Sequence, residues 1–277
     1  MRATLVSLLL IAALMHASWN GLLKSGSDKL ASVTLMSLPS AAAAALLSLL
    51  LPPLSPVAWP YAAGSAAVQI VYCLALARAY DHGELSQIYP LARGSAPMLV
   101  AIGAALSAGE WPSAVDLMGL ALVSAGILAL SLGRERLSPA GMVSALFVGS
   151  CIAGYMILDG LGVRFSRNPA SYIAWMTLAQ TLPMPLVYRA LRRTWPILRR
   201  DRETLKGFAA GLLGLGGYAI VVWAMSMTQM ARVSGLRETS ILFATLIGVI
   251  FLNEPFTVRR SISSLAITAG VICLAAY

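Results

Sequence analysis

The chain has 277 residues, of which 58% are hydrophobic and only 11% are charged, and its mean hydropathy is +0.79. A water-soluble domain carries about a quarter charged residues because its surface must be solvated, so this composition excludes a soluble globule. In a soluble protein, a net charge of +9 would indicate a nucleic-acid partner. In a membrane protein the same charge follows from basic cytoplasmic loops, so we expect no nucleic acid among the partners.

Apolar runs of about twenty residues, the length that crosses a hydrocarbon core of about 30 Å, follow one another along the chain. Breaks at glycine, proline and charged residues divide these runs into ten predicted transmembrane helices, with no room for a soluble domain. The helices are expected near residues 4–23, 31–51, 58–79, 86–108, 113–133, 139–158, 170–191, 205–228, 233–253 and 257–276. The first run could also be a secretory signal, but it continues through Trp19 and no clean cleavage site follows. The predicted fold class is therefore an all-α membrane protein.

The second half of the chain repeats the first at a shift of 144 residues, except that the first helices fit better at a shift of 136 residues. Under the shift of 144 residues Arg93 aligns with Arg237, and Glu110 aligns with Glu254. The predicted five-helix repeats are residues 1–135 and 136–277. Because five is an odd number, the second copy must cross the bilayer in the opposite sense, which gives an inverted repeat. Carriers built this way bind substrate near the midplane, between the repeats, and work by alternating access.

Basic residues are distributed unevenly between the two sides of the predicted bundle. The loops after odd-numbered helices hold fourteen Lys and Arg residues, seven of them in the stretch 189–206, whereas the opposite side holds four. The positive-inside rule assigns the more basic side to the cytoplasm. Both termini are then expected outside.

Ionisable side chains inside a bilayer cost at least about 2.5–3.5 kcal/mol each on insertion scales, so they are functional candidates. Arg93 and Arg237 lie within predicted helices four and nine, and Glu238 directly follows Arg237. Pro90 and Pro97 flank Arg93, which predicts a helix with interrupted backbone hydrogen bonds at this point. Arg93 is interpreted as pointing into a substrate pathway, where it attracts an anionic group. The alternative is an arginine that snorkels or satisfies the freed carbonyl groups.

The repeat also leads to a hypothesis about gating. Since helices four and nine run in opposite senses, Arg93 is expected on the same side as Glu254, and Arg237 on the same side as Glu110. Each pair would form on the closed side of the carrier and break on the open side. The alternative is that both glutamates lie in interfacial water and pair with nothing.

The first predicted helix contains His16, Trp19 and Asn20. A histidine titrates near neutral pH, so His16 is a candidate carrier of a coupling proton. Asn20 lies one turn further on the same face and is a candidate hydrogen-bond partner of a substrate. For both side chains the alternative is hydrogen bonding between helices. Trp19 is a candidate for the same pocket or an anchor at the membrane interface.

Further polar and aromatic side chains inside the predicted helices indicate a polar, aromatic pocket. These candidates are Gln69, Tyr72, Tyr89, Tyr155 and Tyr218. Each one taken alone can equally serve packing or interfacial anchoring. No metal or cofactor is expected, because the three cysteines lack metal-ligand spacing and no catalytic motif is present. For the same reason the chain is not expected to be an enzyme.

Ten helices, a five-plus-five duplication, and the pairs Gly109-Glu110 and Asn253-Glu254 at the ends of helices four and nine resemble the drug/metabolite transporter superfamily, EamA type. The resemblance covers essentially the whole chain. It implies an inner-membrane, multi-pass carrier whose cavity is lined mainly by helices one, three, four, six, eight and nine. The motifs at residues 16–20 and 85–94 are similar to a branch linked with phosphonate utilisation.

Together these observations predict a secondary carrier for a small anionic or zwitterionic organic metabolite, working as an exporter of amino-acid-like compounds. An importer of phosphonate-type compounds is one alternative, and a non-transporting membrane scaffold is another. The expected partners are a small-molecule substrate, the lipid bilayer and coupling protons, with the chain as a monomer or a homodimer.

Overall fold

The computed structural model describes residues 3–24, 28–79, 82, 85–130, 138–195, 201–252 and 257–276. Within these ranges every regular element is helical and no strand occurs. The helices are α1 (Ala3–Lys24), α2 (Lys29–Leu50), the short 3-10 helix η1 (Pro56–Ala58), α3 (Trp59–Ala79), α4 (Leu85–Ala108), α5 (Ala114–Ala129), α6 (Pro139–Phe165), α7 (Pro169–Thr181), α8 (Pro183–Arg192), α9 (Arg202–Met225), α10 (Met230–Arg237), α11 (Ser240–Leu252) and α12 (Val258–Ala276). The described residues contain eight helical segments long and apolar enough to cross a membrane, and α5 is a shorter apolar helix.

Local sequence explains where several of these helices begin. The side chains of Asp28, Ser138, Asn168 and Asp201 accept hydrogen bonds from backbone N–H groups in the first turns of α2, α6, α7 and α9. Ser113 caps α5 in a reciprocal capping box with Asp116. Such caps satisfy backbone donors that have no partner inside the helix. Each helix therefore begins at a polar residue directly before an apolar run.

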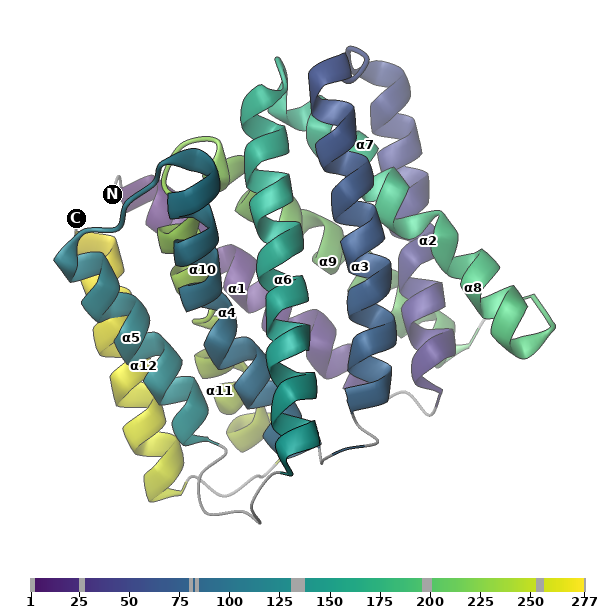
Figure 1. Ribbon diagram of the computed structural model, residues 1–277. Coiled ribbons are helices and arrows are strands. Elements are labelled where there is room, and N and C mark those ends of the chain that lie inside the picture. The colour runs from purple at the N-terminus through teal and green to yellow at the C-terminus, as the bar shows by residue number, and fades with distance from the viewer. Residues whose placement is uncertain are drawn as a thin grey trace.

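Two predicted helices are interrupted in the structure. The stretch expected at 170–191 ends as α7 at Thr181 and resumes as α8 at Pro183, since proline supplies no backbone donor. Helix α8 leans away from the other helices (Figure 1). The stretch expected at 233–253 is divided into α10 and α11 beside Glu238. At this break the Thr239 hydroxyl donates to the Leu236 carbonyl over 2.8 Å, which satisfies one freed acceptor.

The interruption of backbone hydrogen bonds predicted around Arg93 occurs without a break in the helix, because Pro90 and Pro97 have no backbone N–H to donate. Helix α4 continues through Pro90 and Pro97, and buried side chains line it on both sides of the arginine. Close packing of α4 against α5 and α6 holds these turns in helical geometry. Tertiary packing thus outweighs the local preference of proline at this position.

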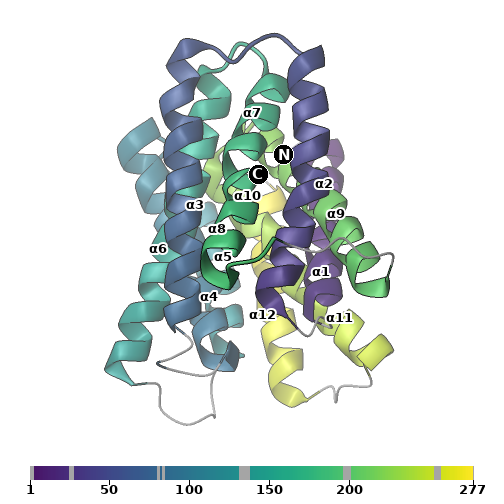
Figure 2. The same cartoon turned by 90° about the vertical axis from the view of Figure 1, so that its right-hand side faces the viewer.

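Both chain termini lie at the same end of the bundle, here called the terminal end (Figure 1). The connections at residues 51–58, 109–113, 166–168 and 226–229 also lie there. The other end is called the basic end, because Arg78, Arg189, Arg192, Arg259 and Arg260 lie toward it. Figure 2 shows the same division from the side.

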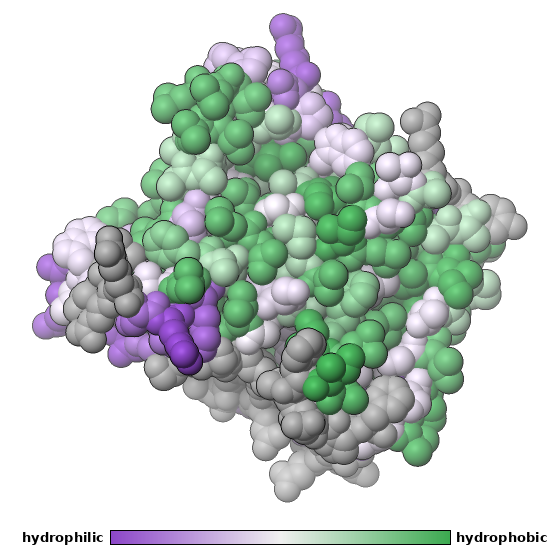
Figure 3. All heavy atoms as spheres, turned by 180° about the vertical axis from the view of Figure 1, so that it is seen from behind, coloured by the Kyte–Doolittle hydropathy of each residue, from purple (hydrophilic) through white to green (hydrophobic). Residues whose placement is uncertain are grey.

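Small residues bring several helices into close contact. Helix α5 packs along α12 with Gly119 facing the backbone of Gly270, so closely that an added Cβ at Gly270 would lie 2.5 Å from the Gly119 carbonyl oxygen. Elsewhere, α3 packs on α6 and α1 packs on α9. The outer face is broadly apolar, as the space-filling view from behind shows (Figure 3). This apolar exterior with buried polar groups is the arrangement expected for helices in a bilayer.

Candidate functional site

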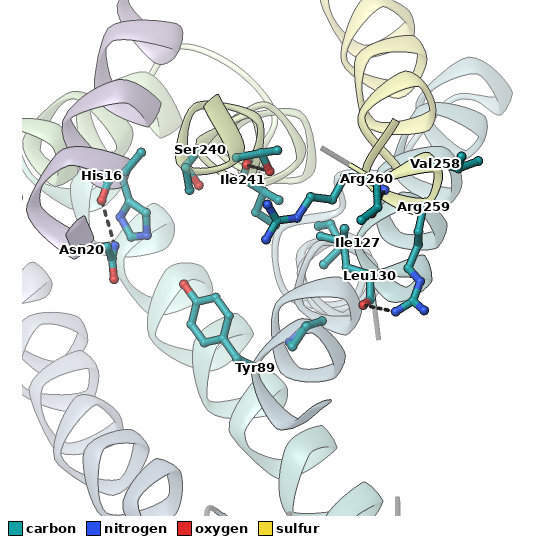
Figure 4. Close-up of a pocket in the computed structure, with 15 residues that line it drawn as sticks. His16, Asn20, Tyr89, Ile127, Leu130, Ser240, Ile241, Val258, Arg259 and Arg260 are labelled. Carbon is teal, nitrogen blue, oxygen red and sulfur yellow. Dashed lines mark hydrogen bonds between the residues drawn. The ribbon is translucent and has the colours of Figure 1, made fainter. Parts of the chain in front are cut away.

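A cavity of about 680 Å³ lies between α1, α4, α5, α11 and α12. Arg259 and Arg260 at the start of α12 and Leu130 after α5 line its mouth, so it opens at the basic end. His16 and Asn20 line it from α1 (Figure 4). This volume lies within the range of about 300–1,000 Å³ typical of small-molecule sites.

A buried ion pair lies directly behind the inner wall of the cavity, where Ser240 lines it. The Arg93 Nη2 atom is 2.9 Å from Glu238 Oε2, and both side chains are almost fully buried. The same nitrogen donates a hydrogen bond of 3.3 Å to Ser240 Oγ, and Ser240 itself lines the cavity. The Arg93 Nε donor is buried and has no partner among the described residues. The Nε–H group of Arg93 therefore lacks an acceptor, and an anionic ligand would supply one.

Arg237 is the last residue of α10 and lies next to Glu238, at the break between α10 and α11. Its guanidinium lies 5.5 Å from the centre of the Tyr218 ring, and its Nη1 atom is 3.3 Å from the Met156 sulfur. Among the described residues no carboxylate lies within ion-pair distance of it. An aromatic face stabilises a cation only partly, so this buried arginine adds positive charge to the site.

Three tyrosines form a line beside the two arginines. Tyr155 contacts Tyr72 and Tyr218 edge to face, with ring centres 6.0 Å and 6.1 Å away respectively. Gln69 on α3 has a buried side-chain oxygen with no hydrogen-bond partner among the described residues. The predicted aromatic candidates thus lie together, on α3, α6 and α9.

The remaining predicted residues lie around the cavity. Tyr89 lines it from α4, opposite His16 and Asn20 (Figure 4). The Asn20 side chain donates to the His16 carbonyl over 2.8 Å. Trp19 packs edge-on against the His16 imidazole at 5.0 Å between ring centres and is not among the residues that line the cavity. Its observed contact is therefore with His16 rather than with the cavity space.

Asp159 is a buried acid that the sequence analysis missed. Its carboxylate accepts hydrogen bonds from the hydroxyl groups of Tyr218, over 2.6 Å, and Tyr172, over 3.2 Å. The sixth helix was predicted to end at residue 158, so Asp159 fell outside the predicted helices. Because α6 continues to Phe165, the carboxyl group lies inside the bundle and is fully buried.

The terminal end is closed by four charged residues, here called the terminal clamp: Glu110, Asp116, Arg164 and Arg232. Glu110 forms an ion pair with Arg164 and accepts the backbone N–H of Met230 over 2.8 Å. Arg164 also donates to the carbonyls of Met225 and Thr228, each over 2.8 Å. These bonds join the end of α6 and the loop after α4 to the connection between α9 and α10.

The second half of the clamp joins α5 to α10. Arg232 approaches both carboxylate oxygens of Asp116, at 2.7 Å and 3.1 Å. The predicted gate pair of Glu110 with Arg237 was wrong, because Glu110 pairs with Arg164, and so was the alternative of an unpaired Glu110. Glu254 lies outside the described residues, and Arg93 pairs with Glu238 instead.

Fold and site together define a polytopic α-helical membrane protein with a cavity of mixed polar and apolar lining that is open at the basic end, while charged residues clamp the terminal end. Residues 139–276 match the model of the EamA-like transporter family. The chain belongs to this family, and the family identifies it as a membrane transporter of the drug/metabolite type. The family expected from the residues is thereby confirmed, whereas the phosphonate-linked branch stays a prediction.

A comparison of structures agrees with this fold. A solved structure described as "Crystal structure of protein" matches with a TM-score of 0.76 at 18% sequence identity. The match covers 99% of this chain and 96% of that chain. At this identity the match shows a shared fold and nothing about substrate. No curated protein sequence matches the chain significantly.

Proposed function

We propose that the protein is a secondary transporter that moves a small anionic or zwitterionic organic metabolite across the cell inner membrane by alternating access. The single observation that carries this proposal is the cavity that opens at the basic end and has the buried Arg93–Glu238 pair directly behind its Ser240 wall, while the terminal end is clamped. A cavity accessible from one side only is one of the two states that alternating access requires.

The proposed architecture has ten crossings, formed by the eight long segments together with α5 and the α7–α8 pair. The two repeats are residues 1–135 and 136–277. Helix packing supports this arrangement, since the third helix of the first repeat, α3, packs on α6, the first helix of the second repeat. In the same way α1 packs on α9, and α5 packs on α12. These contacts are the ones that a pseudo-two-fold axis would exchange.

The charges behind the inner wall of the cavity favour a zwitterionic substrate. A carboxylate or phosphonate group would accept hydrogen bonds from Arg93, whose Nε lacks a partner, and an ammonium group would approach Glu238. Asn20, Tyr89 and Ser240 supply neutral polar contacts in the cavity. Amino-acid-like compounds have this combination of groups, and we assign the protein to their export with coupling to protons.

The positive-inside rule gives the proposed orientation. It assigns the basic end to the cytoplasm, so the cavity is open inward, the terminal clamp seals the outside, and both termini are external. A reporter enzyme active only outside the cytoplasm, fused to the C-terminus, should be active. If the C-terminal reporter is inactive while the same reporter fused to a loop at the basic end is active, the orientation is the opposite one.

Flux through purified protein tests the function itself. Proteoliposomes should take up labelled amino acids or aminophosphonates faster than protein-free liposomes, and excess unlabelled substrate inside should accelerate entry by exchange. A neutral sugar of similar size serves as the control and should not exchange. If no zwitterion in such a panel moves, the protein acts as a scaffold and the proposal fails.

A further inference from the structure

We propose that Asp159 is the site that binds and releases the coupling proton during transport. This inference rests on the proposed function, because it names the group through which proton binding is linked to the transport cycle. Asp159 differs from the other acids inside the bundle in having no arginine partner among the described residues.

Each of the other acidic side chains described inside the bundle or at the terminal clamp contacts an arginine. Glu238 pairs with Arg93, Glu110 with Arg164, and Asp116 with Arg232. In the described part of the chain Asp159 has no cation within ion-pair distance, and it is fully buried. A buried carboxylate without a counter-ion carries a large desolvation cost. A proton is a ligand small enough to reach this site and neutralise its charge.

The surroundings of Asp159 are neutral on the helices that touch it. Helix α7 supplies the Tyr172 hydroxyl, and α9 supplies the Tyr218 hydroxyl. Helix α3 supplies Ser65, whose hydroxyl accepts a 2.9 Å hydrogen bond from the side-chain amide of Gln180. Hydroxyl groups both donate and accept hydrogen bonds, so they can bond either form of the carboxyl group. This shell therefore suits a group that changes its protonation state.

The charged groups on the other helices packed against α6 are engaged elsewhere. Helix α4 contributes Arg93, which pairs with Glu238, and α10 contributes Arg237, which lies over the Tyr218 ring. Tyr155 of α6 itself contacts Tyr218 edge-on. Tyr218 is thus the link between the arginine-rich end of the cavity and Asp159, since its ring faces Arg237 and its hydroxyl bonds the carboxylate.

The position of Asp159 gives access to the outer side when the carrier changes state. Arg164, five residues later on α6, bonds the carbonyls of Met225 and Thr228 at the end of α9. Opening the terminal end must separate α6 from the end of α9 and break these bonds. The Asp159–Tyr218 hydrogen bond joins the same two helices, so the opening that breaks the clamp also exposes the carboxyl group to water from outside. In the inward-open state the carboxyl group is closed to the outside, and its proton leaves toward the cavity along the Tyr218 hydroxyl, which bonds Asp159 and belongs to the ring that faces Arg237.

Infrared spectroscopy of the purified full-length protein tests the proposal without a substrate. Every carboxyl group that titrates between the two buffers contributes the carbonyl stretch of a protonated acid, so the difference spectrum of the wild type is compared with that of each variant. Subtracting the Asp159→Asn spectrum from the wild-type spectrum should leave one such band. The same subtraction with Asp116→Asn, which removes an equally buried carboxylate paired with an arginine, should leave none over a pH interval in which the paired carboxylate stays ionised. Tyr172→Phe should keep the Asp159 component and shift its titration. An Asp159→Asn spectrum identical to that of the wild type overturns the proposal.

A transport measurement separates this inference from the proposed function. In proteoliposomes that show exchange of a zwitterionic amino acid, Asp159→Asn should retain exchange and lose accumulation driven by a pH gradient. His82→Gln, which changes an exposed titratable group outside this cavity, should retain both. Accumulation by Asp159→Asn equal to the wild type contradicts the proton site but leaves the transporter assignment intact. If the wild type shows no flux at all, the transporter assignment is contradicted, and the infrared measurement alone then tests whether Asp159 binds a proton.

Discussion

Arg93 and Glu238 form an ion pair that has lost nearly all contact with solvent. The attraction between two buried charges offsets their desolvation only when both partners are present, so removing one costs about 3–5 kcal/mol. Such a pair contributes little net stability compared with apolar residues of similar size. Its place directly behind the inner wall of the cavity, with an unpartnered arginine donor, agrees with a role in binding substrate rather than in folding.

We expect Arg93→Ala to abolish flux and to lower the unfolding free energy by about 3–5 kcal/mol, since Glu238 is left as an unpaired buried charge. The double variant Arg93→Ala, Glu238→Gln should recover most of the stability but none of the flux. Thermal unfolding in detergent and liposome exchange measure the two effects. Arg167→Ala, at an exposed position, is the control and should leave both unchanged. Wild-type exchange by the double variant would contradict the binding role.

The sequence was informative about single residues where the cost of a charge in the membrane is large. Arg93, Arg237 and Glu238 were recognised for this reason, and all three are buried together. The Arg93–Glu238 pairing was not predictable, because it depends on how α4 lies against the α10–α11 break. Asp159 was missed through an error of seven residues in the end of one helix, because hydropathy alone does not locate a helix end next to glycine-rich apolar sequence.

At the scale of elements, the terminal clamp joins the connections at the terminal end of the bundle. Glu110 and Arg164 are linked to each other and to three backbone groups of the α9–α10 connection. Charge-assisted hydrogen bonds contribute about 1.5–3 kcal/mol each. The clamp is therefore the main described contact that must break when the terminal end opens.

Glu110→Gln should weaken the clamp and shift the population toward the outward-open state by about tenfold, the equivalent of one such bond. A cysteine introduced at Ser234, which is buried behind the clamp, reports this shift through its labelling rate from the terminal end. Glu203→Gln, at the other end of the bundle and exposed, should not alter the rate. An unchanged rate in Glu110→Gln would remove the clamp from the opening mechanism.

The α5–α12 contact makes a separate prediction about packing. A Cβ at Gly270 would clash with the Gly119 carbonyl and with Val123, so Gly270→Leu should destabilise the protein by about 1–3 kcal/mol or more. Gly21→Ala meets nothing within 4 Å and should be neutral or stabilising by up to about 1 kcal/mol, the helix preference of alanine. Thermal unfolding gives the melting temperature of both variants. If Gly270→Leu melts at the same temperature as Gly21→Ala, the close packing of α5 on α12 is contradicted.

At the scale of elements, hydrophobic runs predicted where helices lie but not where they break. The prolines of α4 remove backbone hydrogen bonds as predicted, yet the helix stays continuous. The break occurs instead between α10 and α11, in a stretch without proline. Hydropathy reports burial in the bilayer, whereas helix breaks depend on the packing and hydrogen bonds that the folded bundle supplies.

For the whole molecule, the structure is one state of the proposed cycle. The cavity is open at the basic end, the clamp is closed at the terminal end, and the buried charges lie between them. The proposed inverted repeat would account for a second state, because such a repeat can exchange the conformations of its halves. The charged groups are not symmetric, however: Glu110 of the clamp aligns with Glu254 under the shift of 144 residues, whereas Arg164 aligns with Asp28 under the shift of 136 residues that fits the first helices. The seal at the basic end must therefore use different contacts.

Accessibility of two introduced cysteines tests alternating access most directly. After Cys73, Cys151 and Cys273 are replaced, Thr245→Cys in the cavity and Ser234→Cys behind the clamp are exposed singly to a membrane-impermeant thiol reagent from each side. Without substrate, position 245 should react only from the basic end. A transported amino acid should slow this reaction, and position 234 should then become reactive from the terminal end. Reaction of either position from both sides, or rates that do not change with substrate, would contradict alternating access.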